Sequence, residues 1–191
     1  MDVLSCKPFE LVAPDGAARS EGVHVGGIIK YILSTIDPET YDRTITHETR
    51  QYWELGFTWE LAVSRALVER YLVKTPHLVV QLELEHDGVF GTPDAFDTKK
   101  WVLYEMKLTK MSSNRDISDV KVRHWLWQIK AYLKMLEAQE AYIVACYIMG
   151  NYRDVPLEVR MWHLRFSQHE IDVNWRMLMV NKDRMLEERN G

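Results

Sequence analysis

Three residues of this chain have the types and the spacing that metal-assisted hydrolysis requires. Asp94 follows a proline in a segment punctuated by glycine, and Glu105 and Lys107 lie two apart in an apolar run that starts at Trp101. Residues two apart in a strand point to the same face, so Glu105 and Lys107 are expected to face one site. Two acids and a lysine at one sheet edge predict a divalent-metal site with a cation beside it. Such a site has the components that phosphodiester hydrolysis needs.

Further motifs surround these residues in a recognisable order. Pro93–Asp94 followed by Glu105–Lys107 resembles the signature of the PD-(D/E)xK nuclease superfamily. Gln128–Tyr132 is similar to the Q-x-x-x-Y element of its RecB-like and lambda-exonuclease (YqaJ-type) branch, and Gly56–Glu60 is similar to the G-x-x-x-E helix of the same enzymes. The resemblance implies a restriction-endonuclease-like α/β fold with an αβββαβ core, in which helices flank a mixed central sheet.

The hydrophobic pattern, taken separately, indicates the same order of elements. Helices are expected at 25–36, 47–72 and 117–138 and from 168 onward, and strands at 80–85, around Asp94, and at 101–107, 141–149 and 159–166. The first three strands are expected to form an antiparallel meander. The length of 191 residues predicts one domain, with an N-terminal extension (1–45), a core (about 46–150) and a C-terminal strand and helix (158–190).

The resemblance also implies a set of ligands for Mg²⁺ or Mn²⁺. Asp94 and Glu105 are the principal ligands that it implies, Glu60 is an additional ligand, direct or through water, and the backbone carbonyl of Met106 completes the site. Lys107 is suited to orient or deprotonate a water molecule, or to stabilise the developing charge, and the sequence leaves these roles open. The plain alternative is a surface acid after a turn and an ordinary exposed strand end.

Gln128 and Tyr132 are four apart and share one face of the expected helix. Gln128 is expected to orient a ligating carboxylate or to contact DNA, and Tyr132 to form a hydrogen bond with a phosphate or with Lys107. Without the other motifs, a glutamine and a tyrosine at the boundary of the core would be the favoured explanation of the pair. Their place after the Glu105–Lys107 strand favours the catalytic interpretation.

The distribution of charge matters more here than its total. The net charge of −4 does not indicate a nucleic-acid-binding protein. Residues 107–134 nevertheless contain seven basic and two acidic side chains, directly after the proposed active-site strand. Clustered cations bind phosphates, so the expected contacts to nucleic acid are Lys110, Arg115, Lys121, Arg123 and Lys130. The alternative is a solvated helix face.

Composition excludes several other classes of protein. Two cysteines, Cys6 and Cys146, predict neither a disulfide framework nor a zinc site, and they cannot hold a four-cysteine iron–sulfur cluster. No apolar stretch has the length of a membrane span, and the N-terminus lacks the apolar run of a secretory signal. A cytoplasmic location is therefore expected. The motifs of a serine nucleophile elbow and of a phosphate-binding P-loop are both absent from the sequence.

Taken together, these features predict a divalent-metal-dependent deoxyribonuclease, first of all an exonuclease acting on DNA ends in replication, recombination or repair. The small chain, without an attached helicase, favours a phage, viral or bacterial enzyme. The resemblance implies homo-oligomers, since lambda-exonuclease relatives form rings, and a recombinase, an annealing protein or a helicase as working partners. Two alternatives stay open: a structure-specific or single-strand endonuclease, and a catalytically inactive nucleic-acid-binding protein on the same fold.

Overall fold

The strands of the central sheet differ in how far their side chains are buried. The computed structural model describes residues 20–41, 46–66, 77–153 and 157–190. Its five-stranded sheet has the order β2-β5-β6-β7-β8, in which β6 and β7 are parallel and the other neighbours antiparallel. The expected mixed sheet is thus confirmed. The strands are β2 (Leu78–Val80), β5 (Ala95–Asp97), β6 (Val102–Thr109), β7 (Glu140–Tyr147) and β8 (Glu158–Arg165).

Burial along each strand follows its place in the sheet. Most side chains of β6 and β7 are buried on both faces, as in the central strands of an α/β sheet. In β8 half-buried and exposed side chains alternate, because this strand lies at the edge. The central position of β6 gives Glu105 and Lys107 a rigid and largely buried support.

A second, smaller sheet has the order β1-β4-β3. It consists of β1 (Val23–His24), β3 (Leu84–His86) and β4 (Val89–Gly91). The hairpin between β3 and β4 turns at Asp87 and Gly88. Both residues have positive φ angles, as a two-residue type I′ hairpin turn requires. The parallel pairing of β1 with β4 brings residues from the expected N-terminal extension into the fold.

The expected antiparallel meander is confirmed only in part: β2, β5 and β6 are antiparallel neighbours, but the β3–β4 hairpin stands between β2 and β5 in the sequence. The pattern at 80–85 belongs to two strands, β2 and β3, which lie in different sheets. Gln81 stands between them with a φ of 50°, and its backbone N–H donates to the carbonyl of Asp94 at 3.1 Å. This backbone conformation redirects the chain and ends β2. Asp94 itself lies in a bend directly before β5 and not within a strand.

Side-chain caps mark the starts of two of the long helices. The helices are α1 (Val25–Ile36), α2 (Pro38–Tyr41), α3 (His47–Ala66), α4 (Arg123–Met135) and α5 (Gln168–Asn190). The Thr46 hydroxyl caps α3 by accepting the Thr49 N–H at 3.2 Å. At the start of α5, Ser167 and Glu170 form the expected capping box, with hydrogen bonds of 2.8 and 3.3 Å.

The helix expected at 117–138 is shorter in the structure, Arg123–Met135. The helix expected at 117–138 begins only at Arg123, since Asp116 and Asp119 hold the preceding residues in turns; the Asp119 carboxylate accepts the Lys121 N–H at 2.8 Å and caps a short 3-10 helix (Val120–Val122). The expected end of α3 near 72 lies outside the described residues.

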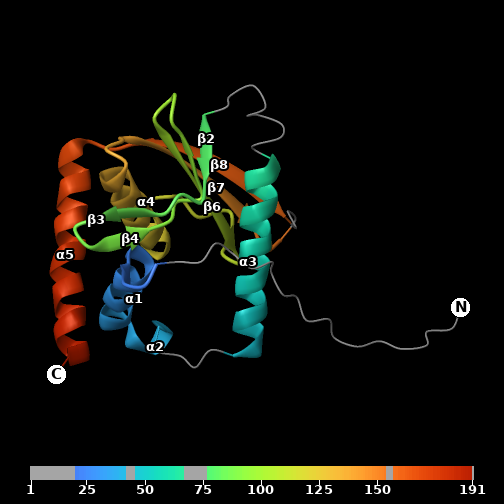
Figure 1. Ribbon diagram of the computed structural model, residues 1–191. Helices are drawn as coiled ribbons and strands as arrows, with labels where there is room; N and C mark the ends of the chain where they lie inside the picture. Colours follow the sequence, from blue (N-terminus) through green and yellow to red (C-terminus); the bar gives the residue numbers. More distant parts are fainter. Residues whose placement is uncertain (1–19, 42–45, 67–76, 154–156, 191) are drawn as a thin grey trace, which may run out of the picture.

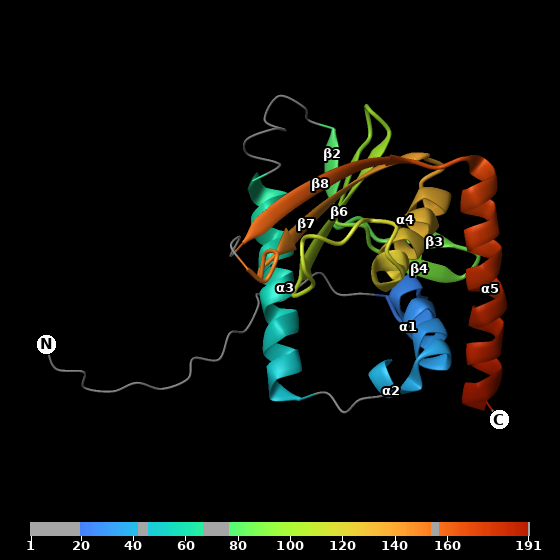
Figure 2. The same cartoon turned by 180° about the vertical axis from the view of Figure 1, so that it is seen from behind.

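The helices cover the sheet on two sides. Helices α4 and α5 pack together on one side with α1 beside them, and α3 lies on the opposite side (Figures 1 and 2). Between α4 and the sheet lies the hydrophobic core, which includes Leu103, Ile129, Leu133, Ile143 and Leu178. Among the described helices, none has the length and the apolar character to cross a membrane.

Candidate active site

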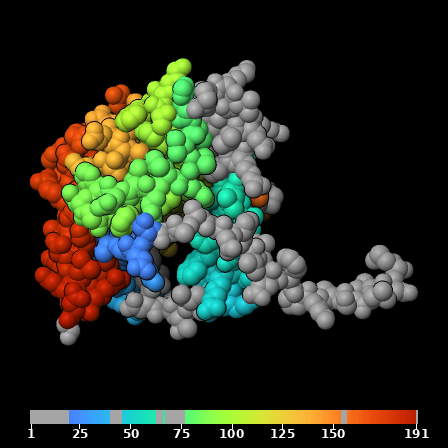
Figure 3. Space-filling view, viewed as in Figure 1, coloured from blue at the N-terminus to red at the C-terminus, as the bar shows by residue number. Residues whose placement is uncertain are grey.

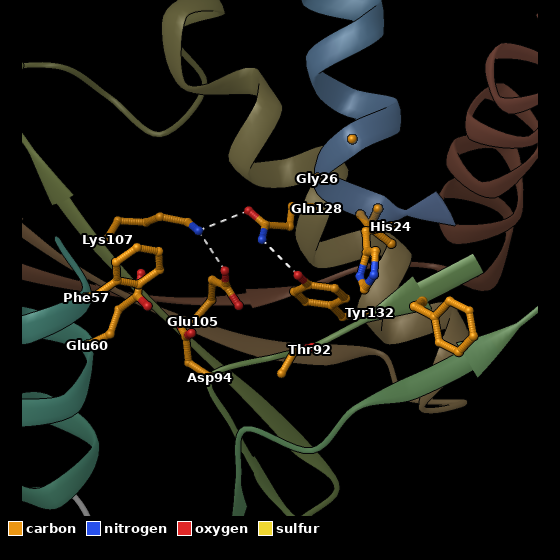
Figure 4. Close-up of a pocket in the computed structure, with 13 residues that line it drawn as sticks. His24, Gly26, Phe57, Glu60, Thr92, Asp94, Glu105, Lys107, Gln128 and Tyr132 are labelled. Carbon is orange, nitrogen blue, oxygen red and sulfur yellow. Dashed lines mark hydrogen bonds and ion pairs between the residues drawn. The ribbon is translucent and has the colours of Figure 1, made fainter. Parts of the chain in front are cut away.

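Six of the residues singled out by the motifs line one cavity of about 220 Å³. They come from three places in the fold: α3, the segment from Asp94 through β6, and α4. Figure 4 shows the acids in the middle of the cavity, with Phe57 and Glu60 of α3 on one side and His24 and Tyr132 on the other. The predicted residues that line it are Glu60, Asp94, Glu105, Lys107, Gln128 and Tyr132.

The two principal carboxylates are held from neighbouring segments. Asp94 Oδ2 accepts the backbone N–H of Met106 at 2.6 Å, which ties the bend before β5 to the middle of β6. Glu105 is 2% exposed, and its Oε2 atom is buried without a hydrogen-bond partner in the part of the chain that the structure describes. A buried carboxylate oxygen that lacks a donor is costly. This oxygen is therefore a ready acceptor for a cation.

Negative charge is concentrated around Asp94. Burial raises the pKa of Asp94 well above its usual range, and the neighbouring charges of Glu105 and Glu60 raise it further. The ammonium group of Lys107 and the Met106 N–H act in the opposite direction without cancelling these effects. Asp94 thus lies in a poorly solvated place beside two other acids, and a cation bound to its carboxylate would relieve the repulsion.

Lys107 places a positively charged ammonium group beside these carboxylates. Its Nζ atom donates to Glu105 Oε1 at 2.6 Å and to Gln128 Oε1 at 3.0 Å (Figure 4). Burial alone would lower the pKa of Lys107, but the charges of Glu105 and Asp94 outweigh it and raise that pKa. Lys107 is therefore a charged hydrogen-bond donor at neutral pH.

Gln128 connects Lys107 to Tyr132. Its Nε2 atom donates to Tyr132 Oη at 2.9 Å while its Oε1 atom accepts from Lys107. The spacing of four residues on α4 brings both side chains to the face that covers β6. The sequence motif thus corresponds to a continuous hydrogen-bonded chain. That chain fixes the direction of the lysine.

The donor set fits a hard divalent cation such as Mg²⁺ or Mn²⁺. Such ions prefer carboxylate and carbonyl oxygens and keep several water ligands. Within the described ranges, no three acidic, histidine or cysteine side chains lie close enough to enclose an ion by themselves. Asp94 and the unpartnered oxygen of Glu105 are accordingly the two side-chain positions that suit a direct ligand. The roles of Glu60 and of the Met106 carbonyl stay predictions.

The predicted basic residues do not gather at the cavity. Lys110 pairs with Glu48 at 3.2 Å, and Arg115 pairs with Asp119 at 2.7 Å. Lys130 lies on the opposite face of α4 from Gln128, with its Nζ atom 5.8 Å from the centre of the Phe166 ring. Lys121 and Arg123 are exposed just before and at the start of α4. Their contacts to nucleic acid stay predictions.

Several residues that line the cavity were missed at the sequence level. His24, Gly26 and Gly27 reach it because β1 pairs with β4 and α1 starts beside the acids. Phe90 and Thr92 complete this side. Nothing local in residues 23–27 indicates this placement, since it depends on a pairing with residues far along the chain. In the space-filling view, the first residues of α1 and the surface of α3 lie on the same face of the molecule (Figure 3).

Comparison with solved structures finds similar folds at low sequence identity. The protein SSO0001 superposes with a TM-score of 0.50 and 13% identity, over 86% of this chain and 78% of that one. An alkaline exonuclease from Laribacter hongkongensis gives 0.49 and 14%, over 88% and 91% of the two chains. A phage-related exonuclease from Haemophilus somnus 129PT gives 0.48 and 10%, over 86% and 83%. Neither models of protein families nor curated proteins match this sequence.

Proposed function

We propose that this chain is a divalent-metal-dependent deoxyribonuclease that hydrolyses phosphodiester bonds at DNA ends. The observation that carries the proposal is the buried Asp94–Glu105 pair with a charged Lys107 at 2.6 Å from Glu105, in which one Glu105 oxygen has no hydrogen-bond partner among the described residues. Most buried polar atoms in folded proteins have such a partner. A buried carboxylate oxygen without one, in a cavity with a second acid, therefore supports a cation site.

In the proposed reaction, Asp94 and Glu105 hold the metal ion, and Glu60 and the Met106 carbonyl support it directly or through water. The bound ion supplies charge neutralisation at the phosphate and lowers the pKa of a water molecule. The residues that would hold the ion come from α3, the bend before β5, and β6.

Lys107 acts as a donor in this scheme. Because its pKa is raised by Glu105 and Asp94, it is protonated at neutral pH and is a poor base. It donates a hydrogen bond to the attacking water or to a non-bridging phosphate oxygen, where negative charge develops. Gln128 holds the ammonium group in place, and Tyr132 in turn holds the Gln128 amide. Gln128 and Tyr132 are thus positioning residues for the lysine.

Exonuclease action is the first choice because the motif set resembles that of the lambda-exonuclease type. The test is a time course on end-labelled single- and double-stranded DNA and on covalently closed circles, with Mg²⁺, Mn²⁺ or EDTA. We expect release of short products from linear DNA only, with no reaction in EDTA. Asp94→Ala should abolish cleavage and leave the circular dichroism spectrum unchanged. Metal-dependent cleavage by Asp94→Ala at the wild-type rate would refute the proposal, and cutting of circles would shift it to an endonuclease.

A further inference from the structure

A second cavity, of about 190 Å³, borders the candidate active site. Helix α3 contributes Tyr52, Trp53, Gly56, Phe57 and Glu60 to it, and β6 contributes residues 106–108. Phe57, Glu60 and Lys107 line both cavities, so the two are neighbours across these three side chains. Whatever occupies the second cavity therefore lies directly beside whatever occupies the first.

Large aromatic side chains form its open wall. Trp53 is 48% exposed and Phe57 is 46% exposed, and these two side chains form an aromatic stripe on α3. They are four residues apart on the helix and so present neighbouring ring surfaces on one side of it. Tyr52 lies beside them, half-buried, with its ring 4.5 Å from the Lys110 ammonium group. This stripe faces the cavity and not the core.

Gly56 keeps the space between these rings open. A Cβ atom at this position would meet no other atom within 4 Å. Close packing therefore does not require glycine here, and glycine within a helix costs about 1 kcal/mol relative to alanine. The missing side chain leaves room in the cavity. That room is consistent with a ligand seated over the helix.

We propose that this second cavity holds one unpaired nucleobase of the strand whose phosphate lies in the active site. The inference rests on the proposed function and specifies its substrate as a single-stranded or frayed end. The cavity is smaller than the roughly 300 Å³ at which pockets for drug-sized ligands begin, and so suits a single ring system. Aromatic walls bind bases by stacking, which tolerates any sequence because every base has a π face.

One acidic and one basic side chain, Glu60 and Lys107, line the border between the two cavities. Lys110, which pairs with Glu48, lies over the Tyr52 ring. The Lys107 ammonium group can contact a phosphate next to the base. A base paired within a duplex cannot present its face to Trp53 and Phe57, so the cavity selects an unpaired base.

The test is binding, in EDTA, of fluorescein-labelled single-stranded oligonucleotides that each carry one abasic nucleotide at a different position. For the wild type we expect one position at which loss of the base lowers affinity about fivefold or more. Trp53→Ala should lower affinity for the intact strand by a similar factor and remove the dependence on position. Gly56→Leu, which fills the cavity, should also lower the affinity for the intact strand and remove the dependence on position. Trp53→Phe should keep most of the wild-type affinity and its dependence on position.

Leu55→Ala is the matched control, because Leu55 is exposed on the same helix but lines neither cavity. Leu55→Ala should bind the single strands with the affinity of the wild type. Trp53→Ala should bind duplex DNA with the affinity of the wild type. Equal affinity of Trp53→Ala, Gly56→Leu and the wild type for the intact strand would overturn the base cavity, even if the wild type cleaves DNA with Mg²⁺. Absence of cleavage of every nucleic acid tested would overturn the proposed function itself and this inference with it.

Discussion

Gln128 accepts a hydrogen bond from the Lys107 ammonium group at 3.0 Å, and this contact connects α4 to the strand that carries the acids. The same lysine donates to Glu105 at 2.6 Å, so two acceptors from different elements fix its direction. These two hydrogen bonds order the flexible lysine side chain when the protein folds. The entropy lost in ordering it therefore does not add to the activation free energy of the reaction.

Replacing Gln128 tests this positioning role. Gln128→Ala removes one hydrogen bond to a charged group, so kcat should fall about tenfold or more while KM changes less. Tyr132→Phe keeps the Lys107–Gln128 bond and should have a smaller effect on kcat. Steady-state cleavage of end-labelled DNA gives both constants. An increase in KM at unchanged kcat would assign Gln128 to substrate binding instead.

Removing Lys107 should affect stability as well as activity. The side chains of Lys107 and Glu105 are 16% and 2% exposed, and Lys107→Met leaves a buried carboxylate without its partner. Loss of one partner of a buried pair costs about 3–5 kcal/mol. The double variant Glu105→Gln/Lys107→Met should recover most of the free energy of unfolding, measured in urea with EDTA, yet remain inactive. A stable single variant Lys107→Met would contradict the buried ion pair.

Asp94 should lower the stability of the metal-free protein at neutral and higher pH. Its pKa is raised in the folded state, first by burial and then by Glu105 and Glu60. The folded state therefore binds the proton more tightly than the unfolded chain, and this stabilising contribution is lost as pH rises through the folded pKa. Asp94→Asn should melt about 2–4 °C higher than the wild type at pH 8 in EDTA, for a difference of about 1 kcal/mol.

The control for that comparison is the same pair of proteins at lower pH and with metal. The difference in melting temperature should shrink as pH falls through the raised pKa of Asp94 toward 3.8, the ordinary value of this carboxyl. Mg²⁺ should raise the melting temperature of the wild type more than that of Asp94→Asn, since the ion binds the folded carboxylates. A wild type that is the more stable protein in EDTA at pH 8 would be inconsistent with repulsion among the acids.

His124 lies near this site but should take no part in proton transfer. Burial lowers its pKa to about 4, and the charge of Lys107 acts in the same direction. A histidine pKa lowered by folding destabilises the folded state as pH falls from 6.5 toward about 4, because the unfolded chain binds that proton first. His124→Gln should reduce the loss of thermal stability in this range and leave the pH profile of cleavage near neutrality unchanged. A shifted profile would implicate His124 in the reaction.

The parts of the site that rest on local geometry were predictable from the sequence. Glu105 and Lys107 share a face because they are two apart in a strand, and Gln128 and Tyr132 do so because they are four apart in a helix. These spacing rules do not depend on contacts with the rest of the chain. The structure brings all four side chains into one cavity with Asp94.

The parts that depend on distant contacts were not predictable. Alternating apolar residues at 80–85 are typical of a single strand, and the break at Gln81 involves a hydrogen bond to the Asp94 carbonyl. Likewise, β1 reaches the site only by pairing with β4. The stripe on α3 shows a third limit: helical spacing places Trp53 and Phe57 on one side, but it does not tell whether that side meets the core or a cavity.

The central claim is that Asp94 and Glu105 bind a hard divalent cation between β5 and β6. Titration with Mn²⁺, followed by electron paramagnetic resonance of the free ion, tests it without requiring any substrate. We expect saturable binding by the wild type, and a loss of about tenfold or more in affinity for Asp94→Asn and for Glu105→Gln alike, each confirmed as folded by circular dichroism. Binding that is absent from the wild type, or equally strong in both variants, would contradict the account.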